Sequence, residues 1–116
     1  MKRATLYQTV RKTLIERALA VKQHITITSD TSVDLKSLLE AAIRDEARML
    51  DLSLSRTAER LQAFEGQYGM TSEAFIKRFE TGELDESLDY IEWAGEVKTY
   101  HLLQSQQQAL QSLQLR

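Results

Sequence analysis

The sequence contains no cysteine, no proline and only four glycines among its 116 residues. Without cysteine, the chain can form neither a disulfide nor a thiolate metal site. Proline and glycine are the main helix-breaking residues, so their scarcity permits long uninterrupted helices. The rest of the sequence is rich in Leu, Ala, Gln, Glu, Lys and Arg, which all favour helix. The composition therefore predicts an all-α chain of about one domain.

Long apolar runs and catalytic motifs are also missing. No stretch is apolar enough over sufficient length to span a bilayer, and no continuous apolar region follows the basic start, Met1-Lys2-Arg3. We therefore expect a cytoplasmic protein with no membrane partner. There is no glycine-rich phosphate loop or nucleophile motif, and neither His24 nor His101 has metal-ligand spacing. The sequence accordingly predicts no catalytic residue, no metal and no cofactor.

Charge of each sign is concentrated in a different part of the chain. Residues 1–60 carry eleven basic and eight acidic side chains, a net of +3, whereas residues 61–116 carry four and nine, a net of −5. Residues 1–22 hold six basic side chains and one acid, and residues 80–96 hold seven acids and no basic residue. This asymmetry favours two surfaces with different tasks.

The apolar spacing predicts several helices. A first helix is expected over residues 4–22, and the β-branched, alternating run 24–28 predicts a short strand or an extended linker. A second helix should begin near Val33, with Thr31 or Ser32 as its N-cap, and continue to about Gly66.

A break near residues 51–53 would divide the second helix in two. Two further helices should follow it. The third is a short helix capped by Thr71 that ends at Glu80 or Thr81, and the fourth spans about 85–113. Together these elements predict an elongated helical hairpin or bundle. Residues 1–30 would form a basic N-terminal helix and linker, and residues 31–116 a helical domain.

The fourth helix carries two stripes of candidate partner-binding residues. Helical spacing places four acids on one stripe and three rings with a valine on a neighbouring stripe about 100° around the helix. The acids are Asp85, Asp89, Glu92 and Glu96, and the second stripe is Tyr90, Trp93, Val97 and Tyr100. One interpretation is docking onto a basic protein surface, because Trp and Tyr are favoured interface anchors. The other is that the rings pack against the second helix.

Two other function classes stay open at the level of sequence. Carboxylates four residues apart can share a cation, so the chain could be a helical, metal-dependent nucleotide hydrolase, although the second helix offers no matching acidic cluster. A structural or scaffold helical homo-oligomer is the other alternative. We expect a homodimer both for a protein that docks onto a basic partner and for a scaffold protein. A chain this short gains stability by burying a long helix pair.

The basic N-terminal segment raises DNA binding as a further hypothesis. A strand followed by two helices is the order of a ribbon-helix-helix dimer, but the side chains of residues 24–28 are not a strong base-reading set. Six basic side chains near the N-terminus could contact DNA phosphates. These are Lys2, Arg3, Arg11, Lys12, Arg17 and Lys22.

Residues 68–94 resemble one known family. The run Tyr68-Gly69-Met70-Thr71-Ser72-Glu73-Ala74-Phe75 is followed by Phe79, by Gly82-Glu83-Leu84, and by Asp89 and Glu92-Trp93-Ala94. This pattern is similar to the C-terminal half of small prokaryotic antitoxin-type proteins (TumA-like), which are encoded beside TumE-type toxins. The resemblance extends over about residues 61–100 and does not include residues 1–30.

The resemblance implies a non-enzymatic protein that neutralises a small basic toxin and represses its own operon. Phe75, Phe79, Tyr90 and Trp93 would then be structural residues or toxin-facing anchors. Asp89 and Glu92 would be acidic contacts to the toxin. The basic segment 2–22 would be the part that contacts the operator or dimerises, a position that the resemblance does not cover.

Overall fold

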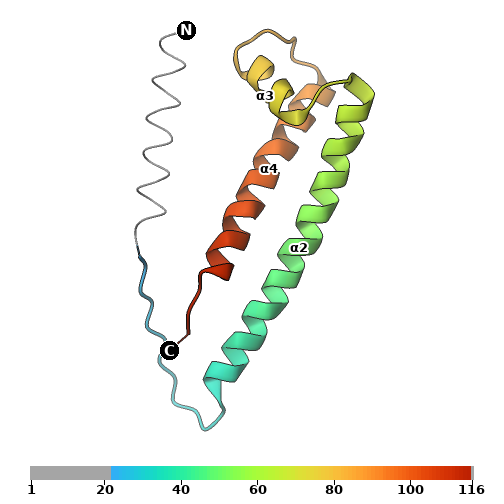
Figure 1. Ribbon diagram of the computed structural model, residues 1–116. Helices are drawn as coiled ribbons and strands as arrows, with labels where there is room; N and C mark the ends of the chain where they lie inside the picture. Colours follow the sequence, from blue (N-terminus) through green and yellow to red (C-terminus); the bar gives the residue numbers. More distant parts are fainter. Residues whose placement is uncertain (1–21, 116) are drawn as a thin grey trace. The chain divides into compact units, whose positions relative to one another are not determined.

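The computed structural model describes residues 22–115 and is all-α in that range (Figure 1). The chain divides into two units, Met1–Ser32 and Val33–Arg116, and the helices described here all belong to the second. Residues 22–31 have no regular secondary structure, so of the two alternatives predicted for residues 24–28 the strand is wrong and the linker holds. A strand needs a neighbouring strand to satisfy its backbone, and the described range offers none. The helix predicted over 4–22 lies almost entirely outside the described residues.

Helix α2, Leu35–Tyr68, is one continuous helix of 34 residues. The break considered near residues 51–53 does not occur. The N-cap is Asp34 rather than Thr31 or Ser32, because its carboxylate accepts hydrogen bonds from both the backbone N–H and the hydroxyl of Ser37. The same two hydrogen bonds lower the pKa of Asp34 below its usual value.

Glycine ends α2 and allows the chain to reverse. Gly69 is the C-cap in the left-handed region, with φ +67°, and its N–H donates to the Glu65 carbonyl. Helix α3, Ser72–Glu80, begins directly afterwards with Thr71 as its N-cap, as the sequence predicts. The Glu65 side chain also accepts from the Ser72 N–H at 2.7 Å, which fixes the last turn of α2 to the first turn of α3.

Helix α4, Leu88–Gln111, starts three residues later than Asp85. Ser87 is its N-cap and accepts a hydrogen bond from the Tyr90 N–H at 3.1 Å. Asp85 therefore lies in the α3–α4 loop and is not part of the acidic helical stripe predicted for it. α4 runs back alongside α2, so the two long helices form an antiparallel hairpin with α3 at its closed end (Figure 1).

The core lies at the closed end of this hairpin. Its buried members come from all three helices, and partly buried rings from α2, α3 and α4 surround them. The buried set is Leu61, Phe75, Trp93, Ala94 and Val97. Farther along the hairpin the packing continues through Leu50 and Thr57, which are buried on the same face of α2. None of the helices in residues 22–115 has the length and apolarity needed to cross a membrane.

Candidate protein-binding surface

The predicted ring stripe of α4 is the packing face of that helix. Trp93 and Phe75 are completely buried and stack with their ring centroids 3.9 Å apart. Phe64 and Tyr68 of α2 stack on the same indole at 5.5 and 5.8 Å. These contacts match the interpretation in which the rings pack against the second helix, so they are unavailable as anchors for a partner in this structure.

A hydrogen bond fixes the orientation of the central indole. Trp93 Nε1 donates to the Ser72 hydroxyl at 2.9 Å, which satisfies the only polar atom of a fully buried side chain. Phe79 stacks on Phe75 and also belongs to the shell around the core. The residues that the family resemblance implies to be structural or toxin-facing therefore hold α3 and α4 together.

Two of the four predicted acids are also engaged inside the hairpin. Tyr68 donates its hydroxyl hydrogen bond to Asp89, across from α2 to α4. This bond and the nearby carboxylate charge raise the pKa of Tyr68 to about 12. Glu96 lies 3.5 Å from Arg60 through one oxygen, while its Oε2 atom is buried with no hydrogen-bond partner. These two acids serve the α2–α4 contact.

The remaining two predicted acids, Asp85 and Glu92, form a solvent-exposed group with Glu86 at the start of α4. Asp85 and Glu86 lie in the loop and Glu92 lies one helical turn after Leu88, and all three are exposed. We call these three residues the acidic rim. No lysine or arginine occurs between Glu80 and Glu96, so nothing in this stretch of sequence neutralises the rim locally.

Large apolar side chains lie beside the acidic rim. Leu88 is 86% exposed and Ile91 is 51% exposed, although both are in the first turn of an otherwise well-packed helix. Spacing of three residues places them on the same side of α4, and Leu102, three turns further, continues that side. We call Leu88, Ile91 and Leu102 the α4 outer face. Leu88 and Ile91 are neighbours on this side, whereas Leu102 lies about 16 Å farther along the helix.

The α4 outer face was not among the predicted site residues. Helical spacing in the sequence pointed instead to the rings of α4, which are the more common interface anchors, and these rings lie in the core. A signal for the outer face was present, because Leu88, Ile91 and Leu102 recur at helical spacing on the side away from Trp93. A helix with rings on one side and leucines on the other has more apolar surface than one intramolecular contact can cover.

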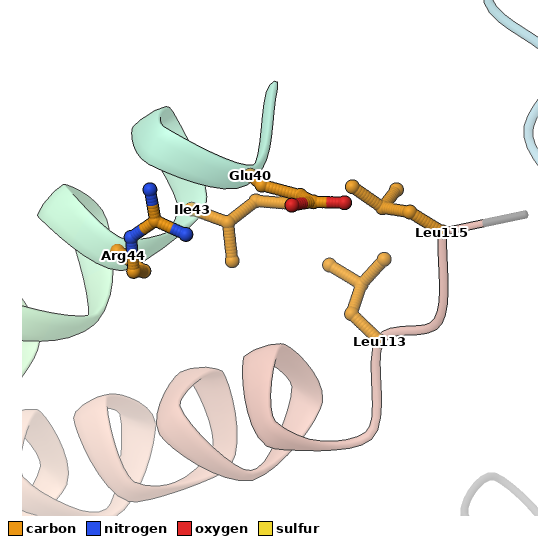
Figure 2. Close-up of a pocket in the computed structure, with 5 residues that line it drawn as sticks. All are labelled: Glu40, Ile43, Arg44, Leu113 and Leu115. Atoms are coloured by element: carbon orange, nitrogen blue, oxygen red, sulfur yellow. The ribbon is translucent and has the colours of Figure 1, made fainter. Parts of the chain in front are cut away.

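One shallow pocket lies at the open end of the hairpin. In Figure 2 the Leu113 and Leu115 side chains, from the segment after α4, point toward the first turns of α2. Glu40, Ile43 and Arg44 line the opposite wall. The pocket combines three aliphatic side chains with one acid and one base. Its lining is that of a packing seam between α2 and the segment after α4.

Most of the basic residues predicted for DNA contact lie outside the described residues. These are Lys2, Arg3, Arg11, Lys12 and Arg17. Lys22 is described and is exposed. Within residues 22–115 no three His, Asp or Glu side chains come together in a way that would hold a metal ion.

Comparison with family models, with curated proteins and with solved structures finds no match to this chain.

Proposed function

We propose that this chain is a non-catalytic protein-binding module that neutralises a small basic protein, in the manner of the antitoxin-type proteins that it resembles. The observation that carries the proposal is the first part of α4. There the exposed Leu88 and Ile91 lie next to the acidic rim, in a stretch with seven acids and no basic residue. The contact surface is thus the outward side of the helix whose inward side carries Trp93.

The chemistry of this surface fits a basic partner with an apolar ridge. Burying Leu88 and Ile91 supplies hydrophobic free energy of about 1.5–3 kcal/mol for each fully covered side chain. The acids around them repel one another in the free protein, and basic side chains on a partner would relieve that repulsion. Complementary charge also raises the association rate and excludes other acidic proteins as partners.

The buried ring cluster has an indirect role in this proposal. Trp93 is packed between α2 and α3 residues and hydrogen-bonded to Ser72, so the start of α4 is held in one position. A preorganised surface loses little conformational entropy on binding, and more of the contact free energy then appears as affinity. The basic side chains from Lys2 to Lys22 remain the candidates for an operator contact.

The test begins with the neighbouring reading frame. We expect it to encode a small basic protein that arrests growth when expressed alone and that co-purifies with this chain. The Kd of the complex should increase with salt, because exposed charges are screened. A neighbour that is neither toxic nor bound would contradict the proposal.

Matched charge reversals locate the surface. Glu92→Lys should weaken toxin binding at least about tenfold, since it replaces a favourable contact with repulsion. Glu59→Lys makes the same charge change at an exposed acid of α2 and should leave the affinity within about twofold. Equal effects of the two variants would show that only the net charge matters and that the acidic rim is not the site.

A further inference from the structure

A second exposed apolar stripe runs along the first half of α2. Leu38, Met49 and Leu52 are 58, 60 and 46% exposed, and Ala42 between them is also exposed. With the half-buried Leu35 and the exposed Asp45, these positions repeat at intervals of three and four residues. We call Leu35, Leu38, Ala42, Asp45, Met49 and Leu52 the α2 outer stripe. That spacing is the heptad seam by which two helices pack together.

The seam is separate from the contact between α2 and α4. On a helix with about 3.6 residues per turn, the α2 outer stripe points well away from Leu50 and Leu61, which face α4. The burial of individual residues agrees, because Leu50 and Leu61 are 5 and 8% exposed. α2 therefore has two apolar seams, and the hairpin occupies only one of them.

The segment that carries the α2 outer stripe differs in charge from the segment that leads into α4. Residues 34–60 carry five basic and six acidic side chains, a net of −1, whereas residues 80–96 have a net of −7. The acidic segment 80–96 favours a strongly basic partner, whereas the nearly neutral segment 34–60 does not. Because segment 34–60 carries charges of both signs, it is compatible with packing against a second copy of itself. Arg48, which pairs with Asp45 along α2, places a basic group beside the only acid in the seam.

From the heptad spacing and this charge balance we propose that the α2 outer stripe is a homodimer interface in which α2 of a second copy packs antiparallel. This inference does not depend on the proposed toxin contact. In the antiparallel register, Leu35 faces Leu52, Leu38 faces Met49, and Ala42 faces Asp45, each twice by symmetry. A parallel pair in register would place Asp45 against its own counterpart and bring two like charges together in the seam.

The size of the contact sets the expected affinity. The stripe from Leu35 to Leu52 covers about 27 Å of helix, from a rise of about 1.5 Å per residue. One helix pair of that length is at the small end of specific interfaces, so the dimer should dissociate with a Kd on the order of micromolar. The full chain should consequently pass from monomer to dimer over a concentration series in light scattering or sedimentation.

The first experiment uses a matched pair of substitutions in the full chain. Met49→Lys should raise the Kd of the dimer at least about tenfold, because an unpaired ammonium group is poorly accommodated in an apolar seam. Leu102→Lys makes a comparable change at an equally exposed position of α4, 59 against 60%, and should leave the dimer unchanged. Both variants should keep the helical circular dichroism of the parent. A monomer at all concentrations, or equal loss of dimer in both variants, would overturn the proposal.

The second experiment determines the direction of the helices. Since the chain has no cysteine, single substitutions report on single positions. Oxidising a mixture of Leu38→Cys and Met49→Cys should give a disulfide-linked heterodimer. Leu38→Cys alone should not crosslink, because its two copies would be about 16 Å apart along the helix axis, beyond the roughly 7 Å that a disulfide spans. Efficient crosslinking of Leu38→Cys alone, or no crosslinking of the mixture, would refute the antiparallel pairing.

A stable monomer that Met49→Lys destabilises would indicate that another part of the chain covers the stripe.

Discussion

Replacing Trp93 with alanine should remove much of the stability of the helical unit. The side chain is completely buried and contacts rings from α2, α3 and α4. Removing a buried Trp or Phe typically costs about 3–5 kcal/mol, because the lost burial is compounded by the cavity left behind. The indole hydrogen bond to Ser72 is lost as well, although the partly exposed Ser72 hydroxyl can turn to water, so that term should be at most about 1 kcal/mol.

This loss is large compared with the total stability of a small domain. Unfolding free energies are usually about 5–15 kcal/mol, so Trp93→Ala should remove a fifth of the stability or more. At roughly 4–8 °C per kcal/mol for a unit of this size, the Tm should fall by roughly 12 °C or more. Helical circular dichroism during urea and thermal unfolding measures both quantities without needing the tryptophan signal.

Two control variants test whether the loss of stability comes from the buried indole. Leu88→Ala removes a large apolar side chain that is 86% exposed, and it should change the unfolding free energy by no more than about 0.5 kcal/mol. Ser72→Ala removes only the acceptor and leaves the buried indole N–H without a partner, so it should cost about 1–3 kcal/mol. If Trp93→Ala cost less than about 1 kcal/mol, or no more than Leu88→Ala, then the indole would not be the centre of the core.

Three further predictions concern the turn, the α2–α4 contact and pH. Gly66→Ala, in the last turn of α2 with open space around the added carbon, should stabilise by about 0.5–1 kcal/mol, whereas Gly69→Ala, at φ +67°, should destabilise by about 1 kcal/mol; opposite signs in urea unfolding are the check. Glu96→Met should be neutral or stabilising by up to about 1 kcal/mol, because it removes a buried carboxylate oxygen that has no partner, and a clear loss of thermal stability would argue against this. Since the pKa of Tyr68 is raised from 10.0 to about 12, the folded state holds that proton more tightly than the unfolded state does. The stabilisation is therefore complete below pH 10 and is lost as the pH rises toward 12. Tyr68→Phe should abolish that part of the pH dependence, and an unchanged alkaline profile would contradict the hydrogen bond to Asp89.

Local signals in the sequence were sufficient to predict α2, α3 and α4. The scarcity of glycine and the absence of proline left α2 uninterrupted, and the Thr71 cap and Gly69 turn acted as local residue chemistry predicts. The N-cap of α2 was misplaced by a few residues because several capping residues occur in a row from Ser29 to Asp34, and only the folded chain shows which carboxylate or hydroxyl meets the helix N–H groups. Of the two alternatives for residues 24–28, the strand does not form because β-branched composition does not supply a pairing partner.

The surface was harder to predict than the helices. Periodicity showed that Trp93 and Tyr90 share one side of α4, but it could not show which side meets α2, because both sides of α4 carry apolar residues. The answer depends on tertiary packing, in which the larger rings displace more water and so are buried in preference to Leu88 and Ile91. Asp89 and Glu96 were predicted as partner contacts because periodicity does not show which side of α4 meets α2. They lie along the edge of α4 that reaches Tyr68 and Arg60.

The orientation of α4 is the claim on which the proposed surface depends, and Trp93 reports it directly. It is the only tryptophan in the chain, so the intrinsic indole fluorescence comes from this residue alone. We expect a blue-shifted emission that resists quenching by acrylamide in the free protein, and the same emission after the basic partner binds, because the partner covers the opposite side of the helix. A red-shifted, readily quenched emission in the free protein, or an emission that becomes protected only on binding, would show that the rings face outward and would contradict the account.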